Sequence, residues 1–259
     1  MINTAFAAVE GVAPKGISIH LAPEVLGHVL GIPLTNTLIT TWFVLTLVIL
    51  GAFWAYRKYR FFPSKAQVAI EALIGSAFDY IAETLESKDL ARKFFPVIMT
   101  IFFFILAMNW VGLVPGVGSI GFYKEGHDAI TPFLHPANTD LNVTLALALI
   151  AFVTIEFAGI VLLGFLKYGG KFVNFKSPLA FVIGLIELVG EIARLASFSF
   201  RLFGNIFAGK TLLVIAIFFV PLFIPIPVLA FEVFVGLIQA LVFAVLTLFF
   251  IKLAVTEPH

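Results

Sequence analysis

Long runs of apolar residues, separated by short polar stretches, divide the chain into a series of helical segments. An α-helix rises about 1.5 Å per residue and the hydrocarbon core of a bilayer is about 30 Å thick, so a membrane-spanning helix needs about 20 apolar residues. Three runs meet this length and predict membrane helices at 34–56, 95–114 and 141–166. The third run follows Asn138-Thr139-Asp140, a sequence typical of a helix N-cap.

A fourth apolar run is about twice as long as a bilayer core requires. Residues 179–220 contain no proline and lie between Pro178 and Pro221. As one helix, these 42 residues would extend roughly 60 Å. The segment must therefore be strongly tilted, lie nearly flat, or break, with Gly204-Asn205 as the candidate position for a break. A short loop at 221–227 leads to a last apolar helix at 228–252, so residues 179–253 are expected to form a tilted hairpin.

Residues 64–93 follow a different pattern. Apolar side chains such as Ile70, Ile74 and Ile81 recur at helical spacing, and Glu71 and Asp79 lie between them. A helix with one apolar and one charged face lies on the membrane surface rather than crossing the bilayer. The chain is therefore expected to be an all-α polytopic membrane protein, with about five membrane helices and one interfacial amphipathic helix.

The composition agrees with this class and excludes others. Hydrophobic residues make up 61% of the chain and charged residues 12%, whereas soluble domains have about 45–50% and about 25%. The mean hydropathy of +1.10 excludes a disordered chain and an ordinary soluble enzyme. The absence of cysteine excludes disulfides, thiolate metal sites and cysteine catalysis. No hydrolase, metalloprotease, phosphate-loop or dinucleotide motif occurs, so we expect neither a catalytic site nor a cofactor.

The positions of the basic residues predict the orientation in the membrane. Eleven of the 16 fall on one side of the predicted topology, and only Lys15 and Lys124 fall on the other. Because cytoplasmic loops carry the excess of Lys and Arg, the N-terminus is expected outside and the C-terminus in the cytoplasm. Residues 1–16 lack the pattern of a cleavable signal. The eleven are Arg57, Lys58, Arg60, Lys65, Lys88, Arg92, Lys93, Lys167, Lys171, Lys176 and Lys252.

The remaining basic residues lie inside the long apolar run or its neighbours. Arg201 is a permanent positive charge near the middle of the run, and a guanidinium in this setting needs a carboxylate partner from this chain or another. Arg201 is thus either a functional charge, part of a structural ion pair, or a residue that stays in contact with water because the helix is tilted. Arg194 is expected to be structural. Six residues of the run follow one another in steps of three or four positions, which places them on a single helical face: Glu187, Glu191, Arg194, Phe198, Arg201 and Asn205.

Polar residues also mark the last helix. Glu232 and Gln239 are seven positions apart and share a face, so in an antiparallel hairpin they can meet Lys210 and Asn205. Such a polar seam is either an ion path or a set of interhelical hydrogen bonds, and the pattern alone leaves both open.

Three further candidates lie in the third apolar run. Glu156 is mid-span, and the sequence offers no obvious partner for it. Asp140 and Asn142 open this span; like Glu156 they are candidates for an ion path, although we favour helix capping as their role. The outer histidines lack the spacing of metal ligands and are expected to be solvated loop residues, with no metal site: His20, His28, His127 and His135.

Three stretches resemble subunit a of the F-type ATP synthases. The run Ser199-Phe200-Arg201-Leu202-Phe203-Gly204-Asn205, with Ala208-Gly209 after it, is similar to the signature of that family. Residues 136–145, PANTDLNVTL, resemble the family's PTxDLNxTL stretch. Gln239-Ala240, Phe243 and Leu246-Thr247 resemble its C-terminal helix, so that the likeness extends from about residue 17 to the end.

This resemblance implies a proton-translocating stator subunit in the membrane sector of the ATP synthase. Two offset half-channels would lead protons to and from carboxylates of the rotating c-subunit ring, coupling proton flow to ATP synthesis. Arg201 matches the essential arginine, a cation that favours the deprotonated ring carboxylate and blocks direct leakage between the half-channels. The implied partners are the c ring, the b-subunit peripheral stalk, other ATP synthase subunits and membrane lipid, without nucleic acid. The implied location is the bacterial plasma (inner) membrane, and residues 1–33, 34–56, 64–93 and 95–259 would be the outer segment, first membrane helix, surface helix and channel-forming domain.

The resemblance also implies roles for the polar residues. Glu232 matches a position tied to the outer half-channel, Gln239 one tied to positioning the arginine, and Asn205 a polar position beside it. Glu187 matches an acidic residue of the cytoplasmic exit, with Glu191 as a weaker neighbour.

Lys210 departs from the family pattern, in which many members have an acidic or otherwise titratable residue. We expect Lys210 to pair with Glu232 and tune it rather than to carry protons. Two other function classes remain as alternatives: a self-contained ion-coupled secondary transporter, which the missing internal repeat disfavours, and a purely structural membrane subunit. The proton is taken as the default coupling ion.

Overall fold

The computed structural model describes residues 23–29, 31–59, 63–114, 116–118, 120–123, 130–172, 178–220 and 223–256. The predicted outer segment is thus described only from residue 23 onward. Several residues used above lie outside the described residues: Lys15, His20, Arg60, Lys124, His127 and Lys176.

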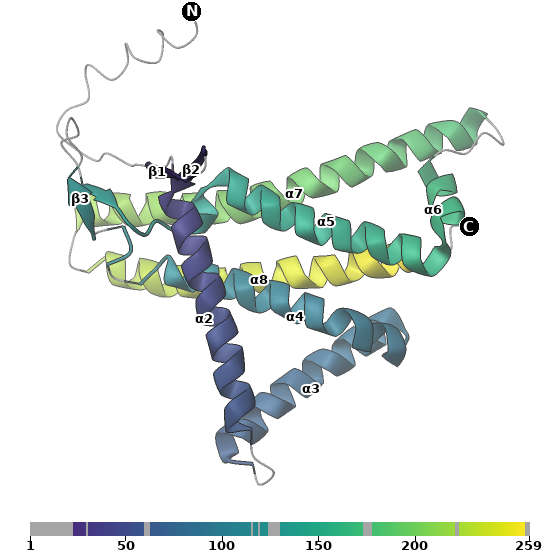
Figure 1. Cartoon of the computed structure of the whole chain (residues 1–259), viewed down its shortest axis with the longest axis horizontal. Coiled ribbons are helices and arrows are strands. Elements are labelled where there is room, and N and C mark those ends of the chain that lie inside the picture. Colours follow the sequence, from purple (N-terminus) through teal and green to yellow (C-terminus); the bar gives the residue numbers. More distant parts are fainter. Residues whose placement is uncertain are drawn as a thin grey trace, which may run out of the picture.

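Five helices in the described part of the chain are long and apolar enough to cross a membrane, which confirms the predicted all-α polytopic class. They are α2 (Asn36–Lys58), α4 (Lys88–Val111), α5 (Leu141–Leu163), α7 (Pro178–Phe219) and α8 (Pro225–Val255) (Figure 1). Two further helices are α3 (Lys65–Leu85) and α6 (Phe165–Phe172), and a 3-10 turn, η2 (Ala137–Thr139), precedes α5. Two antiparallel hairpins complete the fold: β1 (Val25–Val29) with β2 (Ile32–Thr35), and β3 (Gly121–Tyr123) with β4 (Ile130–Pro132).

The long apolar run forms one unbroken helix. α7 continues through all 42 residues, so the break considered near Gly204-Asn205 does not occur. α8 returns antiparallel to α7, and α2 crosses the direction of both at a steep angle (Figure 1). α2 has 23 residues, about 35 Å of helix, which suits an upright crossing. With α2 upright, α7 and α8 form the strongly tilted hairpin that the sequence predicts.

Helix ends differ from the predicted bounds where local caps decide them. The surface helix, expected to run to residue 93, ends at Leu85 because Glu86 adopts a left-handed conformation with φ of 54°. Ser87 then caps α4 by accepting a hydrogen bond from the Leu90 N–H, so residues 88–93 belong to the membrane helix. The third span ends at Leu163, before the predicted 166, because Gly164 has a φ of 84° and turns the chain into α6.

The last membrane helix begins earlier than predicted. Pro225 and Pro227 were expected in a loop but lie in the first turn of α8. The first helical turn has no internal partner for its N–H groups, so proline is tolerated there.

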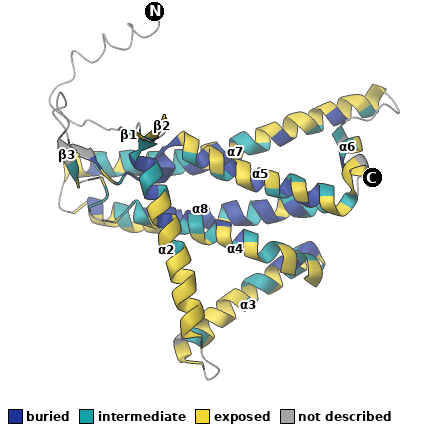
Figure 2. Cartoon of the chain, in the orientation of Figure 1, coloured by how far each residue is buried: buried dark blue, intermediate teal, exposed yellow. Residues whose placement is uncertain are grey.

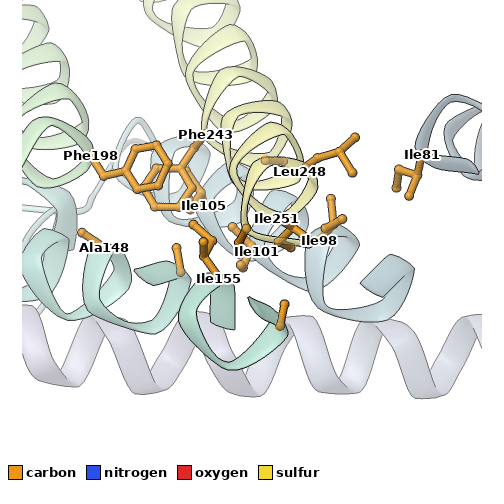
Figure 3. Close-up of a cluster of buried hydrophobic side chains, with 14 of the residues drawn as sticks. Ile81, Ile98, Ile101, Ile105, Ala148, Ile155, Phe198, Phe243, Leu248 and Ile251 are labelled. Atoms are coloured by element: carbon orange, nitrogen blue, oxygen red, sulfur yellow. The ribbon is translucent and has the colours of Figure 1, made fainter. Parts of the chain in front are cut away.

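The buried core lies where α4, α5, α7 and α8 meet (Figure 3). Phe198 of α7 stacks on Phe243 of α8 with ring centroids 4.8 Å apart. Ile105 of α4 and Ile155 of α5 are fully buried beside them. Small residues on the facing helices allow close backbone approach, which drives helix association in membranes: Ala148, Ala151, Ala158, Ala240 and Ala244.

Much of the apolar surface is exposed on the isolated chain (Figure 2). The outward face of α2 and the first half of α7 carry exposed large side chains, with Ile186 65% and Ile192 62% exposed. In a bilayer, such surfaces face lipid tails or apolar helices of other subunits. The exposed half of α7 leads directly to Arg201.

Candidate functional site

Arg201 lies at an open hollow between α7 and α8. The hollow, here called the arginine hollow, has a volume of about 450 Å³. Arg201 is exposed, and its Nη2 donates to Ser197 Oγ at 3.3 Å. Within the described part of the chain, no carboxylate forms an ion pair with Arg201, so the structural ion pair with Glu187 or Glu191 is not formed. The lining residues that bear on function are Glu187, Arg194, Ser197, Phe198, Arg201 and Phe250.

Arg194 has the structural role expected for it. Its Nη1 is 2.6 Å from Oε2 of Glu191, and its guanidinium lies over the Phe250 ring at 3.9 Å from the centroid. The side chains are 13% and 4% exposed. The predicted polar face is therefore divided: Glu187, Arg194 and Arg201 meet at the arginine hollow, whereas Glu191 is buried behind it.

A second cavity lies further along the same two helices. This glutamate cavity has a volume of about 510 Å³ and contains Glu232 of α8, which is 5% exposed. Gly209 of α7 lies directly against the Glu232 carboxyl group, and a Cβ at position 209 would overlap Oε1, Oε2 and Cδ. The polar side chains that line the cavity are Asn109, His135, Asn138, Lys210 and Glu232.

The partner of Lys210 differs from the prediction. Lys210 Nζ lies 3.0 Å from Nε2 of His135, and the expected Lys210–Glu232 ion pair is not formed among the described residues. His135 is 4% exposed, so the expectation of a solvated loop histidine is wrong for this residue. The loop that carries His135 packs against α2, where the His135 N–H donates to Thr40 Oγ1 at 3.0 Å.

Asparagine side chains tie the walls of the glutamate cavity together. Asn138 of η2 donates to Oδ1 of Asn109 at 2.7 Å. Asn109 of α4 in turn donates to the backbone oxygen of Gly236 in α8 at 2.9 Å. Asn109 was not predicted as a site residue, although an asparagine inside a predicted membrane span is a signal for a polar site, and Asn138 was expected only in a helix cap.

Asp140 and Asn142 act as the sequence suggested. Asp140 is the N-cap of α5, and its Oδ1 accepts from the Asn142 N–H at 2.9 Å. Its other oxygen accepts from Thr37 Oγ1 of α2 at 2.8 Å. Asp140 therefore joins α5 to α2 and does not line either cavity.

Asn205 and Gln239 lie between the two cavities along their helices. Asn205 is between Arg201 and Gly209 on α7, and Gln239 is between Glu232 and the hollow-lining Leu246 on α8. Asn205 Nδ2 and Gln239 Nε2 are buried and have no hydrogen-bond partner among the described residues. Because buried amides are nearly always satisfied, these donors indicate bound water or a partner's polar group at this level.

Glu156 lies in neither cavity. Its Oε1 and the hydroxyl of Tyr168 on α6 are buried close to each other, and neither atom has a hydrogen bond of good geometry among the described residues. Burial raises the pKa of Tyr168 above its ordinary value, and the neighbouring Glu156 carboxylate adds to the shift. The ring of Tyr168 packs on the backbone of α5 at Gly159. Tyr168 is thus a polar neighbour of Glu156 that the sequence did not suggest.

Comparison with known proteins identifies the family. A family model described as the ATP synthase A chain matches residues 38–252. The chain belongs to the ATP synthase subunit a family. Its relatives include ATP synthase subunit a of Moorella thermoacetica, 30% identical over 90% of this chain and 96% of the relative. Another is the sodium ion specific ATP synthase subunit a of Propionigenium modestum, 35% identical over 89% of this chain and 78% of the relative. The subunit a of Campylobacter curvus is 33% identical over 83% of this chain and 89% of the relative.

Family membership decides between the function classes. As an ATP synthase subunit a, the chain is a multi-pass membrane protein that works with other ATP synthase subunits. A self-contained secondary transporter is therefore not supported.

Proposed function

We propose that the chain is the ion-translocating stator subunit of the synthase, with the glutamate cavity and the arginine hollow as its two offset half-channels. The observation that carries this proposal is that Arg201 is exposed at mid-helix and forms no ion pair with a carboxylate among the described residues. A charged side chain at the centre of a bilayer costs at least about 2.5–3.5 kcal/mol. A passing carboxylate of another subunit offsets this cost, which is the role a c-subunit ring would have.

The geometry supports different roles for the two cavities along the α7–α8 hairpin. Gly209, at the glutamate cavity, follows Arg201 by eight residues, or about 12 Å of helix. Glu232 would exchange ions with the outer side, and Glu187 would lie at the exit side with Glu191 behind it. Asn205 and Gln239 would hold water or the ring carboxylate between the two. Glu156 would belong to the exit side through its neighbour Tyr168.

Arg201 would act as a fixed cation between the half-channels. A guanidinium stays protonated at any working pH, so it cannot relay a proton. Its charge favours the ionised state of a ring carboxylate that passes it, and its field opposes the direct passage of a cation between the cavities. Coupling of ion flow to ring rotation requires both effects.

The partners and the location follow from the same arrangement. The exposed apolar face of α7 that leads to Arg201 would contact the c ring, and α2 with α3 would be free to contact the b-subunit stalk and lipid. Basic residues at the ends of α2 and α8 favour a cytoplasmic C-terminus in a bacterial plasma membrane. A C-terminal tag should then be digested by protease outside sealed inverted vesicles, and its protection would contradict this orientation.

The coupling ion is proposed to be the proton, since the glutamate cavity is lined by three ionisable side chains: His135, Lys210 and Glu232. The relative from Propionigenium modestum is named sodium ion specific, so sodium is the alternative coupling ion. ATP-driven pumping in sodium-free buffer distinguishes the two. Pumping that requires added sodium would assign sodium instead.

The deciding experiment is ATP-driven ion pumping in inverted vesicles with Arg201→Ala. We expect the complex to assemble and pumping to fall below detection. Arg92→Ala is the matched control, because the Arg92 side chain is 74% exposed at the start of α4 and should pump as wild type. If an assembled Arg201→Ala complex pumps normally, Arg201 has a structural role and the proposed mechanism is wrong.

A further inference from the structure

We propose that His135 is a positioning residue of the glutamate cavity: unprotonated, it holds Lys210 away from Glu232, and on protonation it releases Lys210 to bind Glu232. This inference rests on the proposed function of the cavity as an ion path. It adds a residue from a loop outside the apolar helices, and it makes ion entry dependent on the acidity of the outer side.

The backbone of His135 is anchored to α2. It lies in the loop between β4 and η2, and its N–H donates to Thr40 Oγ1 of α2 at 3.0 Å. Residue 135 is 4% exposed, and its ring faces the same cavity as Lys210 and Glu232. The imidazole is therefore a fixed point to which the longer, more flexible Lys210 side chain reaches.

When Lys210 is charged, its contact with His135 sets the protonation state of the ring. A lysine ammonium has three donors and no acceptor, so it can bond only to an unprotonated ring nitrogen. With Lys210 charged, Nε2 of His135 accepts the hydrogen bond across 3.0 Å, and the ring is neutral with its proton on Nδ1. The pair thus carries one positive charge. A second proton would place two cations in contact and break the hydrogen bond.

The ionisable groups around the pair decide where Lys210 goes when it is released. Among the described residues that line the cavity, the groups other than His135 are Lys210 on α7 and Glu232 on α8. Asp140, the nearest acidic residue after His135 in the sequence, is bound by Thr37 and by the Asn142 N–H. The Glu232 carboxylate is therefore the partner available to the released ammonium. A Glu232 paired with Lys210 is blocked as an ion-exchanging group, so conduction falls when His135 is protonated.

The test measures proton conduction through assembled membrane sectors while the pH on the outer side is varied and the membrane potential is adjusted so that the total driving force stays constant. His135→Gln keeps an acceptor oxygen for Lys210 but does not titrate, so its ratio of conduction at about pH 4.5 to that at about pH 7.5 reports the effect of proton concentration alone. In wild type we expect this ratio to be about fivefold to tenfold lower than in His135→Gln, because the pH is lowered through and below the range in which histidine titrates. Lys210→Met has no ammonium to release and should give the same ratio as His135→Gln.

The control is His28→Gln, because His28 is an exposed histidine on β1 and should retain the wild-type ratio. Only the ratio within each assembled variant is compared, so a lower amount of assembled complex does not affect the result. A wild-type ratio that is no lower than that of His135→Gln overturns the proposal, as does a Lys210→Met ratio as low as that of wild type. Failure of the proposed function is separate, since it would appear as normal pumping by Arg201→Ala at every pH.

Discussion

The close approach of Gly209 to Glu232 makes a sharp prediction for Gly209→Ala. A Cβ at position 209 would overlap the Glu232 carboxyl group, whereas ordinary van der Waals contacts of a Cβ lie at 3.4–4 Å. The carboxyl group must therefore retreat by more than about 1 Å. It is the end of a flexible side chain that faces a cavity of about 510 Å³, so it has room to move. The stability cost should lie at the low end of overpacking, about 1 kcal/mol.

The functional cost of Gly209→Ala should be larger than the stability cost. A misplacement of about 1 Å in a reacting group can lower a rate by about a hundredfold. We expect proton conduction to fall by about tenfold to a hundredfold, with near-normal assembly. The assay is passive proton conduction through assembled membrane sectors, normalised to subunit content.

A second substitution tests the steric reason directly. Glu232→Asp shortens the side chain by one methylene, about 1.5 Å, which relieves the overlap with a Cβ at position 209. The double variant Gly209→Ala with Glu232→Asp should conduct at least about threefold better than Gly209→Ala alone, a coupling that a double-mutant cycle measures. Gly75→Ala is the control, because no atom lies within 4 Å of a Cβ there. Wild-type conduction by Gly209→Ala, or no gain in the double variant, would refute the reasoning.

Two further predictions concern ion pairs. Arg194→Met removes the ion-pair partner of the buried Glu191 and should destabilise the subunit by about 3–5 kcal/mol, whereas Arg194→Met with Glu191→Gln should recover most of that loss. Thermal denaturation of the complex measures both, and equal losses would contradict the buried-charge argument. Lys252 lies 2.5 Å from Glu86, and this hydrogen bond and charge lower the Glu86 pKa below its ordinary value. A carboxyl group whose pKa is lowered in the folded state stabilises the fold at pH values above its ordinary pKa. This stabilisation is lost as the pH falls through the lowered pKa. The melting temperature of Lys252→Met should therefore be slightly below wild type at neutral pH and equal to it in strong acid, and a difference that persists in acid would refute the assignment.

Features encoded in single segments were predictable from the sequence. Hydropathy reports membrane spans directly, so the five helices and the 42-residue run were found, and Asp140 was expected as a cap. The break between α3 and α4 at Glu86 was not predicted, although Ser87 followed by Asp89 is typical of a helix start. The regular spacing of apolar residues on both sides of the break concealed it.

Features that depend on distant contacts were not predictable. Lys210 was assigned to Glu232 because both lie on the hairpin, yet its partner His135 is 75 positions upstream in a loop. The position of that loop depends on Thr40 of α2, a contact that no local pattern encodes. The same holds for Asn109, whose bond to Gly236 joins residues 127 positions apart.

The continuity of α7 has a mechanical consequence. One helix without a break or an internal proline carries side chains of both cavities, from Glu187 at the arginine hollow to Ile217 at the glutamate cavity. Sharp bends in helices almost always need a proline, a bulge or an inserted group, so this rod is built without a hinge. A transporter that alternates its access must bend or rock between two shapes, and α7 supplies no joint for that motion. In the proposed mechanism the moving part is therefore another subunit, while α7 keeps its shape.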